Sequence, residues 1–167
     1  MRFLNIPLNG CVCNFQVSFH HDPFLVSGKE NKHRLTSCTI YAMLPVNDLK
    51  DIHKELLQYA KTNEKCELRE FKEGDKNYYL FHIATGFAEC SKEDQFSRAI
   101  GRKVSLGRAV AAIKKYCENP SETDFFENIN AMVNFDAIDA LNENFRFDFT
   151  DETVKAFNNQ LRKGKYN

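Results

Sequence analysis

Three arginines in one short segment are the residues of this sequence best suited to chemistry. Arg98, Arg102 and Arg108 share the segment with two glycines and with the aromatic residue Phe96. Arginine keeps its charge at physiological pH, and its planar guanidinium can donate two parallel hydrogen bonds to a phosphate. The segment therefore predicts an anion-binding site. Phe96 is a candidate either for stacking on a base or for the hydrophobic core.

The spacing of the arginines limits how one helix can present them. At about 100° per residue, Arg98 and Arg102 lie on the same side of a helix, whereas Arg108 lies well around it. One straight helix therefore cannot bring all three to a small ligand unless it breaks at Gly101 or a second subunit supplies an arginine. A glycine inside a helix costs about 1 kcal/mol relative to alanine. Gly101 and Gly107 thus indicate close packing, a bend or space for a ligand.

The segment from Cys90 to Ala109 resembles part of a family of small bacteriophage proteins. The residues that carry the resemblance are Cys90, Asp94, Phe96, Ser97, Arg98, Gly101, Arg102, Leu106, Arg108 and Ala109. The family is the first Thoeris anti-defence family, phage sponges that sequester cyclic ADP-ribose-type signals made by bacterial TIR enzymes. The resemblance implies that Arg102 and Arg108 contact a nucleotide signal. It also implies an oligomer with ligand pockets between subunits.

The charge balance of the chain is even overall but uneven along its length, since 23 basic residues face 23 acidic ones. Between residues 92 and 115, seven basic residues face only two acidic ones, and between residues 118 and 152, ten acidic residues face only Arg146. The two stretches either neutralise each other within the fold, which would occupy the arginines, or face different partners. Both interpretations stay open.

The remaining sequence argues against several classes of protein. A length of 167 residues suits one domain with its own core. No apolar run approaches the roughly 20 residues that span a bilayer, and no signal peptide is evident, so we expect a cytosolic protein that does not bind membranes. The six cysteines are scattered, which indicates free thiols.

Cys11, Cys13, His20 and His21 lie too close together on one strand to surround a zinc ion easily. Without a recognisable catalytic motif, we expect no enzymatic activity, no cofactor and no metal.

The elements that must position the arginines follow from hydrophobic periodicity and capping signals. The first 44 residues predict strands, among them 11–19 and 35–44, and Asn47 caps a helix that ends near residue 62. Strands return at 65–71 and 77–84, joined by a turn that contains Gly74. Ser91 and Asp94 are spaced as a helix cap, which predicts a helix to about Cys117, before Pro120.

The predicted faces of these helices complete the expected fold. The 91–117 helix should bury Phe96, Ile100, Val104 or Gly107, Val110 and Ala111. A helix from Ser121 should bury Phe125, Phe126, Ile129, Met132 and Val133, and a last one should begin at Thr150 or Asp151. The fold class is therefore α+β, an antiparallel sheet with packed helices. We expect a core domain over 1–117 and an acidic helical extension over 118–167, packed on the core.

The function expected from these features is phage counter-defence in the cytoplasm of the infected bacterium. The protein would bind and sequester a cyclic nucleotide-type immune signal without cleaving it, as a homo-oligomer. Phe96, Arg98, Arg102 and Arg108 are the expected ligand-binding residues. The alternative is a protein inhibitor that docks its acidic helices on a basic surface of a host defence protein. Binding of nucleic acid through the basic helix is a third possibility, which the neutral overall charge disfavours.

Overall fold

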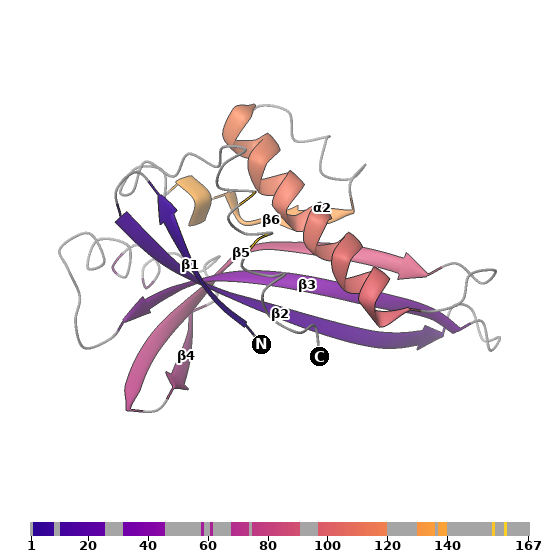
Figure 1. Cartoon of the computed structure of the whole chain (residues 1–167), viewed down its shortest axis with the longest axis horizontal. Helices are drawn as coiled ribbons and strands as arrows, with labels where there is room; N and C mark the ends of the chain where they lie inside the picture. The colour runs from indigo at the N-terminus through magenta and orange to yellow at the C-terminus, as the bar shows by residue number, and fades with distance from the viewer. Residues whose placement is uncertain are drawn as a thin grey trace. The chain divides into compact units, whose positions relative to one another are not determined.

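The protein has an α+β fold, with one long helix and an antiparallel sheet (Figure 1). The computed structural model describes residues 2–8, 11–25, 32–45, 58, 61, 68–73, 75–90, 97–119, 130–135, 137–139, 155 and 159. The strands are β1 (Arg2–Leu8), β2 (Cys11–Leu25), β3 (Lys32–Pro45), β4 (Leu68–Glu73), β5 (Lys76–Cys90) and β6 (Ala131–Val133), and the helix is α2 (Arg98–Glu118). Their order in the sheet is β1-β2-β3-β5-β4, and β6 also pairs with β5. The predicted fold class is confirmed.

Strands β2, β3 and β5 occupy predicted parts of the chain and are longer than expected, whereas β4 (Leu68–Glu73) begins and ends slightly later than the predicted 65–71. β2 continues past residue 19 to Leu25, and β5 continues past residue 84 to Cys90. The turn between β4 and β5 is the predicted one, with Glu73 paired to Lys76. Of the helix predicted from Asn47, only Gln58 and Lys61 are described, and both are helical.

Helix α2 begins later than predicted. Ser97 is its N-cap, with φ −126° and ψ 117°, and the Ser97 hydroxyl accepts a hydrogen bond from the Ile100 backbone N–H at 3.4 Å. Because this backbone is extended, a continuous helix from Ser91 is excluded, and that prediction is wrong. Residues 91–96, with the predicted cap and Phe96, lie outside the described residues. The end of α2 at Glu118 agrees with the predicted end near Cys117.

A second correction concerns residues 131–133, for which the sequence predicts the end of a helix that begins at Ser121. They form the strand β6 instead, with Ala131 opposite Gly86 and Val133 opposite Ala84. Asn130 precedes the strand with φ at 51°, a left-handed conformation that asparagine tolerates and that interrupts a helix. Met132 is 56% exposed rather than buried. Residues 121–129 lie outside the described part of the chain.

The chain forms two compact units, residues 1–17, 40–83 and 134–167 in the first and 18–39 and 84–133 in the second. The core of the first unit contains Phe15, Val17, Ile40, Leu80, Ile83 and Ile138. Gln16 is buried there as well, so β2 does not alternate simply between a buried and an exposed face at this point. The predicted division at residue 118 stays a prediction, because most of 118–167 lies outside the described residues.

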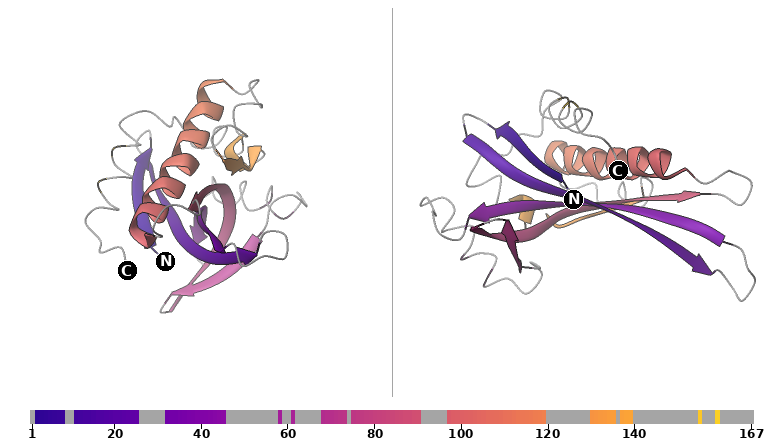
Figure 2. Two further views of the ribbon diagram at one scale, coloured as in Figure 1. Left: turned by 90° about the vertical axis from the view of Figure 1, so that its right-hand side faces the viewer. Right: turned by 60° about the horizontal axis from the view of Figure 1, so that its bottom comes forward.

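In the second unit, α2 packs closely on β3 and β5 (Figure 2). A Cβ atom at Gly86 of β5 would meet the backbone of α2, overlapping the Ser105 carbonyl oxygen and lying 2.6 Å from the Ala109 nitrogen. The buried residues of α2 are Ser105, Leu106, Ala109, Val110, Ala112, Ile113 and Tyr116. Ile100 is 64% exposed, so the predicted buried stripe is wrong there, and of the alternatives Val104 and Gly107 it is Val104 that is half-buried. Small side chains let this face of α2 approach Gly86.

Candidate functional site

Arg98 and Arg102 lie one turn apart at the start of α2, near His21 of β2. Arg98 is exposed and Arg102 is half-buried. Both arginines are close enough to His21 for their charges to act on its imidazole: burial lowers the pKa of His21 most, followed by the positive charges of Arg102, Arg98 and His20. The start of α2 and strand β2 therefore share a cationic cluster, Arg98, Arg102 and His21.

Thr36 of β3 holds the imidazole of His21 in place. His21 Nδ1 and Thr36 Oγ1 are 2.9 Å apart, and Thr36 is only 1% exposed. Gly101 of α2 lies directly over this threonine: a Cβ at Gly101 would overlap Thr36 Oγ1 and lie 3.0 Å from Thr36 Cβ. Of the three uses expected for a glycine at this position, the structure shows close packing. The missing side chain lets α2 place Arg102 beside His21.

Gly101 does not break the helix. Its backbone N–H donates to the Ser97 carbonyl at 2.9 Å, and the Ser105 hydroxyl donates to the Arg102 carbonyl at 3.2 Å. Because α2 continues through this position, Arg108 lies on another side of the helix, as its spacing predicts.

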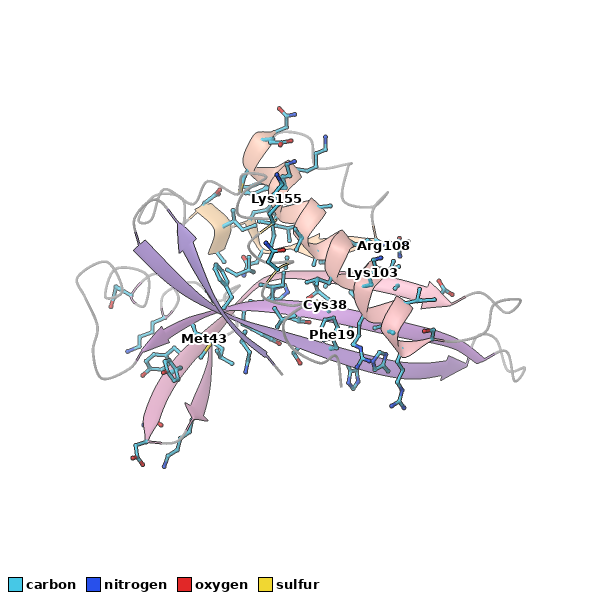
Figure 3. The ribbon with its side chains drawn as sticks, in the orientation of Figure 1. Phe19, Cys38, Met43, Lys103, Arg108 and Lys155 are labelled. Atoms are coloured by element: carbon cyan, nitrogen blue, oxygen red, sulfur yellow. The ribbon has the colours of Figure 1, made fainter. Side chains whose placement is uncertain are left out.

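Arg108 is directed toward β5 (Figure 3). Its Nη1 donates a hydrogen bond to the Phe87 carbonyl at 2.6 Å, and the side chain is half-buried. Within one chain, the structure therefore groups Arg98 and Arg102 with His21 and ties Arg108 to the strand beside β6. Whether Arg108 also contacts a ligand stays a prediction.

The start of α2 has a charge pattern that favours an anion. The positive end of a helix dipole is usually accompanied by acidic residues, yet the first turn of α2 has none and begins with Arg98. Arg102, one turn further along α2, adds to this positive potential. Within the described part of 118–152, Glu118 pairs with Lys114 at 3.8 Å, at the other end of the helix. The remaining acidic residues of that stretch, except Asp139, lie outside the described residues.

Sequence reasoning missed the contributions of His21 and Thr36. The sequence suggests His21 only as a zinc ligand, and in the described residues no three His, Cys, Asp or Glu side chains are placed to hold a metal ion. Strand alternation was the signal that could have singled out His21, because it places His20 and His21 on opposite faces of β2. What sequence could not show is that α2 packs on β3 at Thr36, the residue that holds His21.

Comparisons with protein-family models, with curated proteins and with solved structures found no match to this chain. No helix in the described ranges is both long and apolar enough to cross a membrane.

Proposed function

We propose that this protein binds and sequesters a phosphate-bearing nucleotide signal without cleaving it, as a phage counter-defence protein in the cytoplasm of the infected host. The observation that carries the proposal is the position of Arg98 and Arg102 at the start of α2, where Gly101 packs on Thr36, the hydrogen-bond partner of His21. Two guanidinium groups supply permanent charge and paired hydrogen-bond donors, which suit phosphate oxygens. Sequestration needs only tight binding.

The arrangement of the cluster favours a small anion over a long polyanion. Arg98 and Arg102 lie one turn apart on α2, and Gly101 between them packs on Thr36, the hydrogen-bond partner of His21. A nucleic-acid backbone is held by a row of spaced cations, whereas one phosphate is held by a few cations that meet at one point. Arg102 is also half-buried. A partly desolvated charge discriminates between ligands better than a fully solvated one.

Calorimetric titration tests the proposal with ADP-ribose, cyclic ADP-ribose isomers and cyclic oligonucleotides. We expect at least one of them to bind, and Arg98→Ala or Arg102→Ala to weaken that binding by about 10- to 100-fold, the effect of losing a charged hydrogen bond. Lys103→Ala is the matched control, because Lys103 is an exposed cation of the same helix. It should change affinity by about 3-fold or less, as expected for a solvated charge.

Three results would contradict the proposal. The first is the absence of heat with every ligand, and the second is an equal loss in the Lys103 and Arg102 variants, which would indicate unspecific attraction. The third is chemical conversion of the ligand, detected by chromatography after incubation. An inhibitor that acts through acidic residues of 118–167 would instead stay active in the arginine variants.

Arg108→Ala in the same titration tests the contact that the family resemblance implies. The bond to Phe87 predicts that this variant loses about 1–2 kcal/mol of folding free energy. If Arg108 also binds the ligand, affinity falls as much as in Arg102→Ala at a temperature where both variants are folded. Unchanged affinity would assign Arg108 a structural role only.

A further inference from the structure

His21 is the group of the cationic cluster whose charge can change near neutral pH. We propose that a phosphate bound at Arg98 and Arg102 makes His21 take up a proton, so that its imidazolium becomes the third cation of the site. This inference rests on the proposed function. It adds a ligand-binding residue and a preference for the more highly charged phosphate groups.

The position of His21 supports an electrostatic role. Its Nδ1 is 2.9 Å from Thr36 Oγ1 of β3, and Gly101 in the first turn of α2 packs on the same threonine. A threonine hydroxyl can donate to an unprotonated Nδ1 and accept from a protonated one. The contact with Thr36 therefore persists in both charge states, and the ring can gain a proton without turning.

In the free protein, the positive charges of Arg102 and Arg98 of α2 and of His20 of its own strand act on His21, and β3 contributes the neutral hydroxyl of Thr36. Burial lowers the pKa of His21 below its ordinary value of 6.5, and these charges lower it further. At pH 7 and above, His21 is therefore mostly neutral before a ligand binds.

A bound phosphate reverses this balance. Its negative charge offsets the two arginines and favours the imidazolium, so the pKa of His21 rises in the complex. Below both pKa values, each unit of this rise strengthens binding about tenfold. A terminal phosphate with two negative charges favours the imidazolium more than a phosphodiester with one. The site thus discriminates between phosphates by charge.

Calorimetry in two buffers measures the proton directly. The protein is titrated at pH 7.0 with AMP, 3′,5′-cyclic AMP and ADP-ribose, in PIPES and in Tris, whose ionisation enthalpies differ. Wild type should take up a fraction of a proton for each ligand bound, and more with AMP than with cyclic AMP. His21→Gln should take up less, and the difference between the two proteins removes the contribution of the ligand's own titration. Lys103→Gln is the control, because Lys103 is an exposed cation of α2 outside the cluster, and it should behave as wild type.

Affinity and NMR give two further readouts. We expect His21→Gln to weaken binding about 3- to 10-fold at pH 6.5 and less at pH 8, because the imidazolium is populated mainly at the lower pH. In wild type, the His21 ring proton signal should titrate at a higher pH when ligand is present. That measurement does not depend on the stability of any variant.

The possible failures are distinguishable. If no phosphate compound binds to wild type, the proposed function fails and this inference fails with it. If ligands bind through Arg98 and Arg102 but proton uptake is the same in wild type and His21→Gln, only the role of His21 is overturned. An unshifted His21 signal in the complex would overturn it independently.

Discussion

At the scale of single residues, two glycines of one helix have opposite roles. Gly101 packs on Thr36, whereas a Cβ at Gly107 would meet no atom within 4 Å. Gly101→Ala should therefore lower the free energy of unfolding by about 1–2 kcal/mol, because Thr36 must move and its contact with His21 is disturbed. Gly107→Ala should raise it by about 0.5–1 kcal/mol through helix propensity alone. Urea denaturation of both variants measures the two changes.

The two substitutions control for each other, since both add one methyl group to α2. An equal gain in stability from both would show that Gly101 has no packing role. The close approach of α2 to Thr36 would then no longer explain why Arg102 lies beside His21.

At the scale of elements, the contact between α2 and β5 decides which face of the helix is buried. Gly86 meets the backbone of α2 at Ser105 and Ala109, and backbone cannot move aside as a side chain can. We expect Gly86→Ala to cost about 3 kcal/mol or more, at the upper end of overpacking effects. Thermal and urea unfolding measure the loss. Glu89→Ala, an exposed change in the same strand, should stay within about 0.5 kcal/mol of wild type.

A tolerated Gly86→Ala would mean that α2 is not seated on β5 as described. In that case the hydrogen bond from Arg108 to Phe87, one residue further along β5, would also be in doubt.

At the scale of the whole molecule, His21 links folding to pH. Its pKa is lower in the folded protein than the ordinary 6.5 that applies when the chain is unfolded. As pH falls through 6.5, the unfolded chain therefore binds the proton first, and the contribution of neutral His21 to stability is lost. Without ligand, wild type should lose more stability between pH 8 and pH 5 than His21→Gln does. Lys103→Gln, an exposed change of charge on α2, should follow wild type in the same urea titrations.

The opposite order, with His21→Gln more acid-sensitive than wild type, would contradict the lowered pKa. A saturating phosphate ligand should reduce the acid sensitivity of wild type, because the folded state then also binds the proton.

Local sequence signals predicted several parts of the fold because they act over a few neighbouring residues. Hydrophobic periodicity placed β2, β3 and the β4–β5 hairpin, and the Asn119-Pro120 pair placed the end of α2. The same kind of signal was ambiguous at the start of α2, where two serines can each cap a helix. It also failed at Ala131–Val133, since three apolar residues suit a helix as well as a strand.

What the sequence by itself determined is the α+β class, the basic helix and the shared side of Arg98 and Arg102, which follows from helical geometry alone. Tertiary structure decided the choice of Ser97 as the cap and the burial of the α2 face opposite Gly86. It also decided the packing of Gly101 on Thr36, which brings the start of α2 close to the hydrogen bond between Thr36 and His21. The physical reason is that these features depend on contacts between segments far apart in the chain, where backbone approach and the local electric field are set by the packed neighbours.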